Sequence, residues 1–478
     1  MQEDHQHKYE ALAGYITGLV DKGTLLAGSR VPSLREISTQ QRTSVSTALQ
    51  AYRLLEDKGV LEARPQSGFY VAQRAAISLG APKISNPPKE PTSVAVSAPV
   101  LKLLQYAGDP HFAPLGCAIP SPDLLAAGRL DRFLARAARK KGIAYNTYSL
   151  PQGDPELRRQ IAKRAMQWGQ ALSPADIVIT CGCTEALVLA LKATCKPGDV
   201  VAIESPTYFG LLHAIEVLNL KAFELPTDPV SGIDLDALER ALGTKRIGAC
   251  LFSSSFNNPL GCTIPEEKKI VILDLLAESK VPLIEDDIYG DIYFGHSKRP
   301  KPFMALDKRG RTIYCNSFSK TIAPGYRVGW IIPDGYMQSV LERKFVFTMC
   351  GPTLTQAAMA DFLSSGGYDH HLRRIRRIFA DNLERMVRMV EITFPRGTKV
   401  ARPNGGFVLW VQLPRGIDTR KLFEMAIKKA ICFAPGDVFS ASGRYKDCLR
   451  LSCGFKWTAK IKDAIATLGQ MAGVLVGK

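Results

Sequence analysis

A lysine, a carboxylate and an amide in this sequence each stand at or just beyond the end of a short apolar segment. The pairs are residues 312–315 with Lys320, 281–286 with Asp286, and 248–252 with Asn258. An amine can attack a carbonyl carbon, and a carboxylate can hold or accept a proton. Because a surface lysine or a capped strand end would look the same in isolation, the elements that position these residues decide whether they form a site.

A turn of small residues opens a helical pattern directly after another apolar segment. Residues 177–180 run into Cys181-Gly182-Cys183-Thr184, and a helix is predicted over 185–194. The free backbone N–H groups at the start of such a helix and its dipole both favour an anion. The pattern predicts an anion-binding cradle, although structural turns of this composition are more common than phosphate sites.

From about residue 99 onward, short apolar segments alternate with longer helical patterns. Strands are predicted at 177–180, 200–204, 222–225, 248–252, 281–286 and 312–315. Such alternation favours an α/β fold with a mainly parallel sheet covered by helices on both faces. Ligands of these sheets bind beyond the carboxyl ends of the strands. The polar residues named above stand at those ends.

Several of these segments carry the motifs of a known family. They are Asn257-Asn258-Pro259-Leu260-Gly261, Glu285-Asp286-Asp287-Ile288-Tyr289, Asn316-Ser317-Phe318-Ser319-Lys320 and Pro324-Gly325-Tyr326-Arg327-Val328-Gly329. In this order they resemble the class I and II aminotransferases, which bind pyridoxal phosphate (PLP) in fold type I. The resemblance covers roughly residues 110–478. It implies a PLP-binding domain over 99–478, with a large part at about 140–345 and a smaller C-terminal α/β part at about 355–478.

The resemblance implies catalytic roles for Lys320, Asp286 and Tyr289. Lys320 would hold the cofactor covalently, and Asp286 would keep the pyridine nitrogen protonated so that the ring accepts electrons. Asp287 competes for this second role, and Asp286 is preferred because the family places a tyrosine three residues later, where Tyr289 stands. Tyr289 and Asn258 would hydrogen-bond the phenolic oxygen of the cofactor.

Other matching residues complete the implied cofactor site. Tyr208 would stack on the ring. The phosphate would be held by Arg327, Ser317, Ser319 and the backbone of Cys183 and Thr184. Tyr148, in Tyr148-Ser149-Leu150-Pro151-Gln152-Gly153, resembles the tyrosine that this fold type sends to the phosphate of a neighbouring subunit. The resemblance therefore implies a homodimer with shared sites.

Arg450, in Cys448-Leu449-Arg450-Leu451-Ser452, resembles the family's clamp on the α-carboxylate of the substrate. A bidentate guanidinium suits a planar carboxylate. This match implies a small amino-acid-like ligand. Its side chain would be selected by loops around residues 111–122 and 345–356.

Residues 1–74 predict a separate helical unit that ends in a hairpin. A helix over 9–21 is followed by Ser33 and Glu36, which are spaced as a capping box that begins a second helix. Gln41 and Arg42 form a turn, and a third helix opens near Thr43 or Ser44 with Val45 facing inward. A hairpin over 60–64 and 69–71 follows. Two short helices, a tight turn and a wing predict a winged helix-turn-helix that binds double-stranded DNA.

The segments GSRVPSLRE, RTSVSTALQAYRLLEDKG and ARPQSGFYV resemble the DNA-binding domain of the GntR family. Residues at the tip of the third helix would enter the major groove, and those at the start of the second helix and in the wing would contact phosphates. The predicted DNA contacts are Arg42, Thr43, Ser44, Ser46, Ser33, Arg35, Arg64 and Gly68.

The formal charge of +17 suits a polyanionic partner, but its distribution is uneven. Residues 1–74 contain nine Lys and Arg against eight Asp and Glu, a net charge of only +1. One such unit should bind DNA weakly, so dimerisation or other basic surfaces are expected to help. Residues 75–98, rich in Pro, Ser and Ala, are predicted to form a linker.

A GntR-type domain, a linker and an aminotransferase-like domain together resemble the MocR subfamily of transcriptional regulators. The resemblance implies a PLP-dependent regulator that senses an amino acid or related amine. Two alternatives remain open: an active aminotransferase that carries a DNA-binding domain, and a regulator that senses PLP itself.

Composition excludes several other classes. No run of eighteen apolar residues and no signal peptide are present, which favours a cytoplasmic protein without a membrane partner. The eleven cysteines lack paired zinc spacing, so no metal site is predicted and the thiols are expected to be reduced.

Overall fold

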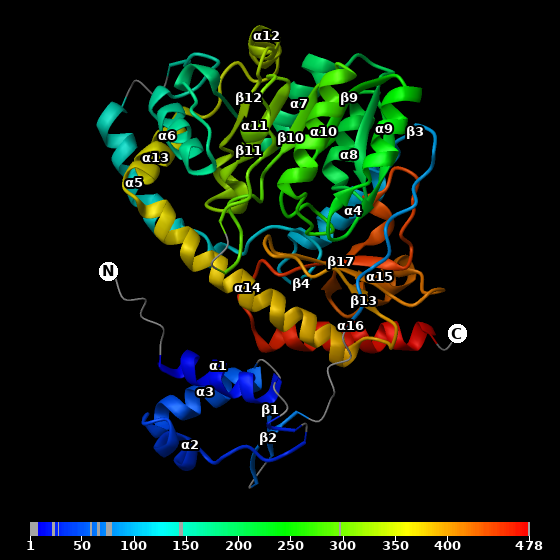
Figure 1. Cartoon of the computed structure of the whole chain (residues 1–478). Helices are drawn as coiled ribbons and strands as arrows, with labels where there is room; N and C mark the ends of the chain where they lie inside the picture. Colours follow the sequence, from blue (N-terminus) through cyan, green and yellow to red (C-terminus); the bar gives the residue numbers. More distant parts are fainter. Residues whose placement is uncertain are drawn as a thin grey trace. The chain divides into compact units, whose positions relative to one another are not determined.

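The computed structural model describes residues 8–21, 24–26, 28–57, 60–64, 67–72, 79–142, 147–295 and 298–476. The chain groups into two compact units. The head unit is Met1–Leu79 with Glu384–Phe394, and the body unit is Gly80–Leu383 with Pro395–Lys478. Figure 1 labels most of the helices and many of the strands of both units.

A mainly parallel sheet forms the centre of the body unit. In the described residues its order is β3-β7-β6-β9-β10-β11-β12-β5, with β8 paired to β7. The strands are β3 (Thr92–Ser93), β5 (Val178–Thr180), β6 (Val200–Ser205), β7 (Lys221–Asp228), β8 (Gly232–Ile233), β9 (Ile247–Phe252), β10 (Leu283–Asp286), β11 (Thr312–Ser317) and β12 (Gly329–Ile332). The predicted fold class is confirmed, whereas β12, which is antiparallel to both of its neighbours, was not predicted.

Alternate side chains of the strands enter two separate cores, one on each face of the sheet. In β9, Ala249 and Leu251 pack in the core with α7 (Cys183–Thr194) and α8 (Phe209–Val217). Cys250 and Phe252 pack in the other core, with α9 (Leu235–Thr244) and α10 (Glu266–Glu278). Because helices cover both faces, most strand positions are apolar, and the strands appear in the sequence as short apolar runs. Polar residues such as Glu285 and Asp286 stand at the carboxyl end of a strand.

The topology brings the carboxyl ends of the site-bearing strands to one edge of the sheet. Strands β6, β9, β10 and β11 run parallel. Strand β5 has the same direction, because it is antiparallel to β12, which is itself antiparallel to β11. Residues that follow these strands therefore lie near one another although they are far apart in the sequence.

Part of the segment predicted to be a linker packs on the body unit. The backbone N–H of Thr227 donates to the Ser85 hydroxyl at 2.7 Å, and β3 pairs with the edge strand β7. Val94 and Val96 are buried, and α4 (Ser97–Gly108) begins at the end of this segment. A two-residue strand is too short to show an alternating pattern, so the sequence carried no sign of it. Residues 75–78 lie outside the described residues.

A smaller antiparallel sheet forms the C-terminal part, in the order β13-β14-β17-β16. Its strands are β13 (Lys399–Val400), β14 (Val408–Gln412), β16 (Ala434–Pro435) and β17 (Cys448–Ser452). A two-stranded parallel pair joins β4 (Ala113–Pro114) to β15 (Ile431–Cys432). This pairing brings the segment after residue 113 against the C-terminal part of the body unit.

Further helices complete the body unit (Figure 1). They are α5 (Ala127–Lys141), α6 (Pro155–Ala165), α11 (Phe303–Leu306), α12 (Met337–Phe347), α13 (Thr353–Ser364), α15 (Thr419–Ile427) and α16 (Ala459–Val476), together with the long helix α14 (Gly367–Thr393), whose last turns belong to the head unit. None of the helices in the described residues has both the length and the apolar character that crossing a membrane requires.

The head unit contains α1 (Lys8–Asp21), α2 (Leu34–Gln40), α3 (Val45–Asp57) and the hairpin β1 (Leu61–Arg64) with β2 (Gly68–Val71). The capping box is present: the Glu36 N–H donates to the Ser33 hydroxyl at 3.3 Å, and the Ser33 N–H donates to Glu36 at 2.7 Å. An additional bridge pairs Arg30 with Tyr70, which the sequence analysis missed. The hairpin turn at residues 65–66 lies outside the described residues.

The inward orientation predicted for Val45 is wrong. Its side chain is 48% exposed, whereas Ala48, Tyr52 and Leu55 are buried. The helix begins only at Val45, so this residue lies in the first turn, before the helix reaches the core of the head unit.

Candidate functional site

Lys320 lies just beyond the carboxyl end of β11, in the turn Phe318–Lys320. Its amine is partly buried and donates a hydrogen bond to the carbonyl oxygen of Ala118 at 2.7 Å. Burial lowers the pKa of Lys320 to about 8, although the neighbouring Cys117 and Asp286 act in the opposite direction. Near neutral pH a useful fraction of this amine is unprotonated and able to attack a carbonyl carbon.

Asp286 ends β10, the strand beside β11, and its carboxylate is buried. It accepts one hydrogen bond from a backbone N–H at 3.2 Å and another from the thiol of Cys183 at 3.5 Å. Burial raises the pKa of Asp286 to about 6. Asp287 instead forms an ion pair with Arg299 at 2.5 Å. Lys320 acts electrostatically on the carboxylate of Asp286.

Replacing Asp286 with asparagine is expected to stabilise the cofactor-free protein at neutral pH. Because the folded-state pKa of about 6 exceeds the ordinary value of 3.8, the folded protein retains a proton that the unfolded chain releases. The stability of the natural protein should therefore fall, relative to Asp286→Asn, as the pH rises from about 4 to about 6. Two pKa units correspond to about 3 kcal/mol. Urea unfolding between these pH values measures the difference.

Asp307→Asn provides a control of opposite sign. Although burial opposes the effect, hydrogen bonds from backbone N–H groups and from Thr312 lower the pKa of Asp307. This carboxylate therefore contributes stability that is lost as the pH falls. A difference between the natural protein and Asp286→Asn that does not change across the window would contradict the assignment of a raised pKa to Asp286.

The turn before α7 has the geometry of an anion cradle. Gly182 precedes the helix with a φ of 82°, and a Cβ added there would collide with the guanidinium of Arg327. Arg327 is exposed and donates to the carbonyl oxygen of Cys181 at 2.8 Å. Gly329 packs against Gly182 and pairs in register with Ser317. These contacts place the guanidinium of Arg327 and the hydroxyl of Ser317 beside the N-terminus of α7.

Other cradle residues have groups available to a ligand. Thr184, in the first turn of α7, is exposed. The hydroxyl of Ser319 is buried and has no hydrogen-bond partner within the described part of the chain. A buried polar atom without a partner is uncommon in a folded protein and is consistent with a missing ligand.

Tyr289, Asn258 and Tyr208 come together from the ends of three strands. The side chain of Asn258 hydrogen-bonds Tyr289, and burial raises the pKa of Tyr289. The Oδ1 atom of Asn258 is buried and has no partner among the described residues. Burial also raises the pKa of Tyr208 to about 12, and Arg450 and Asp286 act on it electrostatically. Asp286 and Arg450 thus act electrostatically on both tyrosines.

Arg450, on β17, is fully buried. Its Nη2 donates to the carbonyl oxygen of Gly116, whereas Nε and Nη1 have no partner within the described chain. Its guanidinium carbon lies 5.5 Å from the ring centre of Phe439. Burial lowers the pKa of Arg450, with Cys117 and Tyr289 opposing the shift. Two buried donors without acceptors suit the two oxygens of a carboxylate.

Residues 116–118 lie in the loop around 111–122 that was expected to select the ligand, but their backbone contacts with both reactive groups were not predicted. The Gly116 carbonyl accepts from Arg450, and the Ala118 carbonyl accepts from Lys320. The thiol of Cys117, between them, influences the pKa of both groups. The two contacts join residues 334 and 202 positions apart in the sequence, so no local pattern could reveal them.

Among the predicted cofactor residues, Tyr148 is the one for which the structure shows no contact with the other residues of the site. Its side chain is 83% exposed, and Leu150, two residues later, is 73% exposed. A tyrosine that serves the site of a neighbouring subunit would be exposed in a single chain. Within one chain, the remaining predicted cofactor residues lie at the strand ends described above.

In the head unit, several predicted DNA contacts are on the surface. Ser33, Arg35, Arg42, Ser44, Ser46 and Gly68 are exposed. Arg42 occupies the turn with a φ of 48°. Ser44 accepts a hydrogen bond from the Thr47 N–H at 3.1 Å, so its hydroxyl caps α3. The turn therefore presents Arg42 directly before the recognition helix.

Two predicted DNA contacts are more engaged within the protein than the sequence indicated. The hydroxyl of Thr43 is buried. The backbone carbonyl of Thr43 accepts a hydrogen bond from the hydroxyl of Ser38 at 2.7 Å. Arg64 pairs with Glu62 at 2.7 Å and lies 4.2 Å from the ring centre of Tyr70. Thr43 was expected to be exposed, but the turn draws it inward. Arg30, beside Gly68 at the wing, is an exposed cation that the sequence analysis missed.

The body unit thus has the fold and strand-end geometry of an aminotransferase, and comparisons with known proteins agree. Residues 122–468 match the family model "Aminotransferase class I and II". Residues 8–71 match "Bacterial regulatory proteins, gntR family". The chain belongs to the class I and II aminotransferase family and carries a GntR-family DNA-binding domain.

Full-length relatives share both parts. The HTH-type transcriptional regulators YjiR and YdcR of Escherichia coli, each named as uncharacterised, are 35% and 36% identical to this chain; each alignment covers 97% of this chain and 98% of the relative. This chain is accordingly a transcriptional regulator of the MocR type, as predicted.

Solved structures resemble the body unit. The α-aminoadipate aminotransferase of Thermus thermophilus, complexed with N-(5'-phosphopyridoxyl)-L-leucine, has a TM-score of 0.74 at 28% identity, covering 80% of this chain and 96% of that one. The kynurenine aminotransferase of Pyrococcus horikoshii has a TM-score of 0.74 at 29% identity, covering 79% and 95%. With the family match, this likeness confirms the predicted cofactor, PLP. The cradle, the unpartnered Ser319 hydroxyl and the amine of Lys320 fit its phosphate and its aldehyde.

Proposed function

We propose that this regulator senses an amino acid or a related amine at the PLP site of its body unit. The main support is the placement of Lys320 and Arg450, which bond to carbonyl oxygens two residues apart on one segment. Two residues of extended chain span at most about 7 Å. Lys320 marks where the cofactor aldehyde, which reacts with amines, would be held, and Arg450 offers donors to a carboxylate. Two such sites this close together suit the two ends of an α-amino acid.

We propose cofactor roles for the residues at the strand ends. When bound, PLP supplies a carbonyl carbon that reacts with amines and a ring that accepts electrons. Lys320 provides the attaching amine, Asp286 holds a proton on the ring nitrogen, and Tyr289 and Asn258 hydrogen-bond the phenolic oxygen. Tyr208 stacks on the ring. The phosphate is held by Arg327, Ser317, Ser319 and the backbone N–H groups of Cys183 and Thr184.

Arg450 binds the effector carboxylate in this proposal. Arg450 belongs to the small C-terminal part, and Lys320 belongs to the large part of the body unit. A ligand that contacts the cofactor in the large part and Arg450 in the small part would favour one closure state of the two parts. That preference is the signal that changes DNA binding by the head unit.

Arg450→Lys is expected to weaken the response to amino acids at least about tenfold, because one ammonium cannot reproduce a bidentate guanidinium. The visible absorbance of the PLP-loaded protein, titrated with a panel of amino acids, measures this response. Arg158→Lys is the matched control, since Arg158 also donates to a backbone carbonyl, that of Pro174, and also has a buried Nε without a partner in the described chain. An unchanged titration in Arg450→Lys would refute the proposed clamp.

A catalytic aminotransferase is the second candidate function. One observation favours it: the chain is 30% identical, over 78% of its length, to a protein named 2-aminoadipate transaminase from Thermus thermophilus. Adding a keto acid to the same titration separates the two functions. Sustained formation of a new amino acid indicates an enzyme, whereas a stable spectral change without product indicates a sensor.

We propose that the chain acts as a homodimer in which Tyr148 of a second subunit reaches the phosphate. Its 83% exposure in the single chain supports this arrangement. A dimer also brings two head units to one DNA site, which offsets the low charge of each. A mass in solution equal to that of one chain would refute the dimer.

A further inference from the structure

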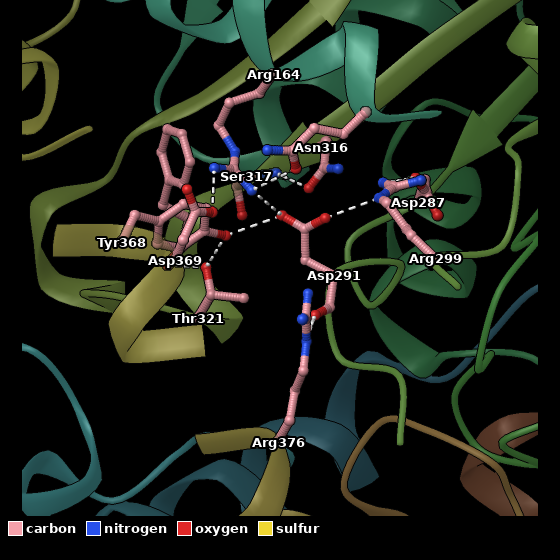
Figure 2. A network of polar contacts seen from close by, with 12 residues as sticks. Arg164, Asp287, Asp291, Arg299, Asn316, Ser317, Thr321, Tyr368, Asp369 and Arg376 are labelled. Atoms are coloured by element: carbon pink, nitrogen blue, oxygen red, sulfur yellow. Dashed lines mark hydrogen bonds and ion pairs between the residues drawn. The ribbon is translucent and has the colours of Figure 1, made fainter. Parts of the chain in front are cut away.

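Lys320 follows β11 and Asp286 ends β10, and a buried polar network links the segments that contain them (Figure 2). Asp291 lies at its centre, and Arg299 joins it to Asp287. The Nη2 of Arg299 contacts Asp287 Oδ2 at 2.5 Å, and its Nε contacts Asp291 Oδ1 at 2.7 Å. The Arg299 side chain is only 7% exposed. One arginine thus bridges two carboxylates of the segment that also contains Asp286 and Tyr289.

The first arm of the network reaches the residues before Lys320. The Tyr314 hydroxyl donates to Asp287 at 2.8 Å, and Asn316 donates to the Tyr314 oxygen at 2.7 Å. The backbone N–H of Ser317 then donates to Asn316 at 2.6 Å. This arm therefore runs from Asp287 to Ser317, three residues before the reactive lysine.

The second arm reaches the residue after Lys320. The Tyr368 hydroxyl donates to Asp291 at 2.9 Å and lies 3.1 Å from the hydroxyl oxygen of Thr321. A ring nitrogen of His371 lies 2.6 Å from the Thr321 carbonyl. Tyr368 and His371 both belong to α14. The network therefore contacts the lysine segment on both sides.

Asp291 is held in its ionised form by the arginines around it. Although burial opposes it, Arg299 and Arg164 keep the pKa of Asp291 well below its ordinary value. Arg164 also pairs with Asp369 at 2.9 Å. Removing one partner would leave a buried charge uncompensated, which is strongly destabilising. The hydroxyl groups of Tyr314 and Tyr368 can be removed without this penalty.

We propose that Arg299, acting with Tyr314 and Tyr368, is a positioning residue that fixes the Lys320 segment relative to the Asp286–Tyr289 segment. The proposal rests on the proposed function, because it concerns the amine and carboxylate of that site. None of the three residues touches the reacting atoms. They act by restraining Ser317 and Thr321, the two neighbours of Lys320 that the network binds.

The test removes single hydroxyl groups and measures the site in two ways. Tyr314→Phe and Tyr368→Phe keep the aromatic rings, including the ring of Tyr368 over which Arg164 lies at 4.2 Å. The first readout is hydrogen exchange of the amides of residues 317–321 in the cofactor-free full-length protein. The second is the pH midpoint of the visible absorbance of the PLP-loaded protein. Tyr52→Phe is the control, since it removes one buried phenol hydrogen bond, to the Pro32 carbonyl in the head unit.

Each site variant is expected to speed exchange at residues 317–321 about fivefold, the equivalent of removing one hydrogen bond. Each should also move the absorbance midpoint by about half a pH unit. Thr321→Val should reproduce the effect of Tyr368→Phe on residues 317–321, because both changes remove the contact between Tyr368 and Thr321. The Thr321→Val, Tyr368→Phe double variant should therefore add little there, although Tyr368→Phe also removes the hydrogen bond to Asp291. Tyr52→Phe should change neither readout.

The outcomes separate this inference from the proposed function. Lower melting temperatures without a change in exchange or midpoint would show a purely structural network and overturn the inference. The variants could exchange faster at residues 317–321 while the natural protein forms no visible band with PLP. That combination would support the network and refute the proposed function. Unchanged exchange together with an unchanged midpoint would overturn the inference even if PLP binds.

Discussion

Lys320→Ala protein is expected to lack the visible absorbance that the natural protein shows with PLP. Lys320 is placed at the end of β11, and burial lowers its pKa to about 8, so its amine is suited to attack a carbonyl carbon. Without that amine the cofactor is held only by non-covalent contacts in the cradle. We expect the substitution to reduce retention of PLP through gel filtration at least about tenfold, a change of about 1.4 kcal/mol or more in binding.

Two controls separate covalent attachment from charge. Lys320→Arg keeps a cation at this position but removes the reactive amine, so it should lose the absorbance as well. Lys301→Ala removes an exposed lysine, paired with Glu266 at 3.1 Å, and should keep it. Borohydride reduction followed by peptide mass measurement locates the attachment directly. A cofactor mass on a peptide that lacks residue 320 would refute the assignment of Lys320.

The parts of the fold that the sequence predicted are those set by local interactions. The capping box of Ser33 and Glu36 needs only residues three positions apart, and it is present. The strand that ends at Asp286 and the turn that precedes α7 follow from apolar runs and a helix start. Motif order then placed Lys320 and Asp286 in one site, because parallel strands end at one edge of a sheet. Arg450, on β17 of the antiparallel sheet, was assigned to this site by the family resemblance alone.

The parts that the sequence did not predict depend on contacts between distant segments. Nothing near Arg299 indicates that it will bridge Asp287 and Asp291. Similarly, no pattern around Gly116 indicates that its carbonyl will accept from Arg450. The burial of a residue near a helix end was also predicted wrongly. Val45 fits a helical apolar stripe, but it lies in the first turn of α3 and is exposed. Periodicity identifies a helix better than it identifies its ends.

The double substitution Arg35→Ala with Arg42→Ala is expected to cause a large loss of DNA affinity. Both side chains are exposed, one in the first turn of α2 and the other in the turn before α3. Each charge-assisted contact to DNA contributes roughly 1.5–3 kcal/mol, so removing two should weaken binding at least about a hundredfold, roughly 3 kcal/mol or more. Fluorescence anisotropy with a long duplex of mixed sequence measures this loss.

The salt dependence of the same titrations shows whether these arginines bind phosphates. For every phosphate that the variant no longer neutralises, the slope of log affinity against log salt should become shallower by about 0.9. Lys8→Ala, which removes an exposed cation from α1 outside the helix-turn-helix, should change neither affinity nor slope. A double variant with the affinity and slope of the natural protein would exclude Arg35 and Arg42 from the interface.

The low charge of the head unit makes a further result informative. If two head units act together, a duplex with two half-sites should bind more tightly than a duplex with one, and the double variant should lose this advantage as well. Equal affinity for both duplexes would mean that one head unit is sufficient. Other basic surfaces would then have to supply the missing electrostatic attraction, because residues 1–74 carry a net charge of only +1.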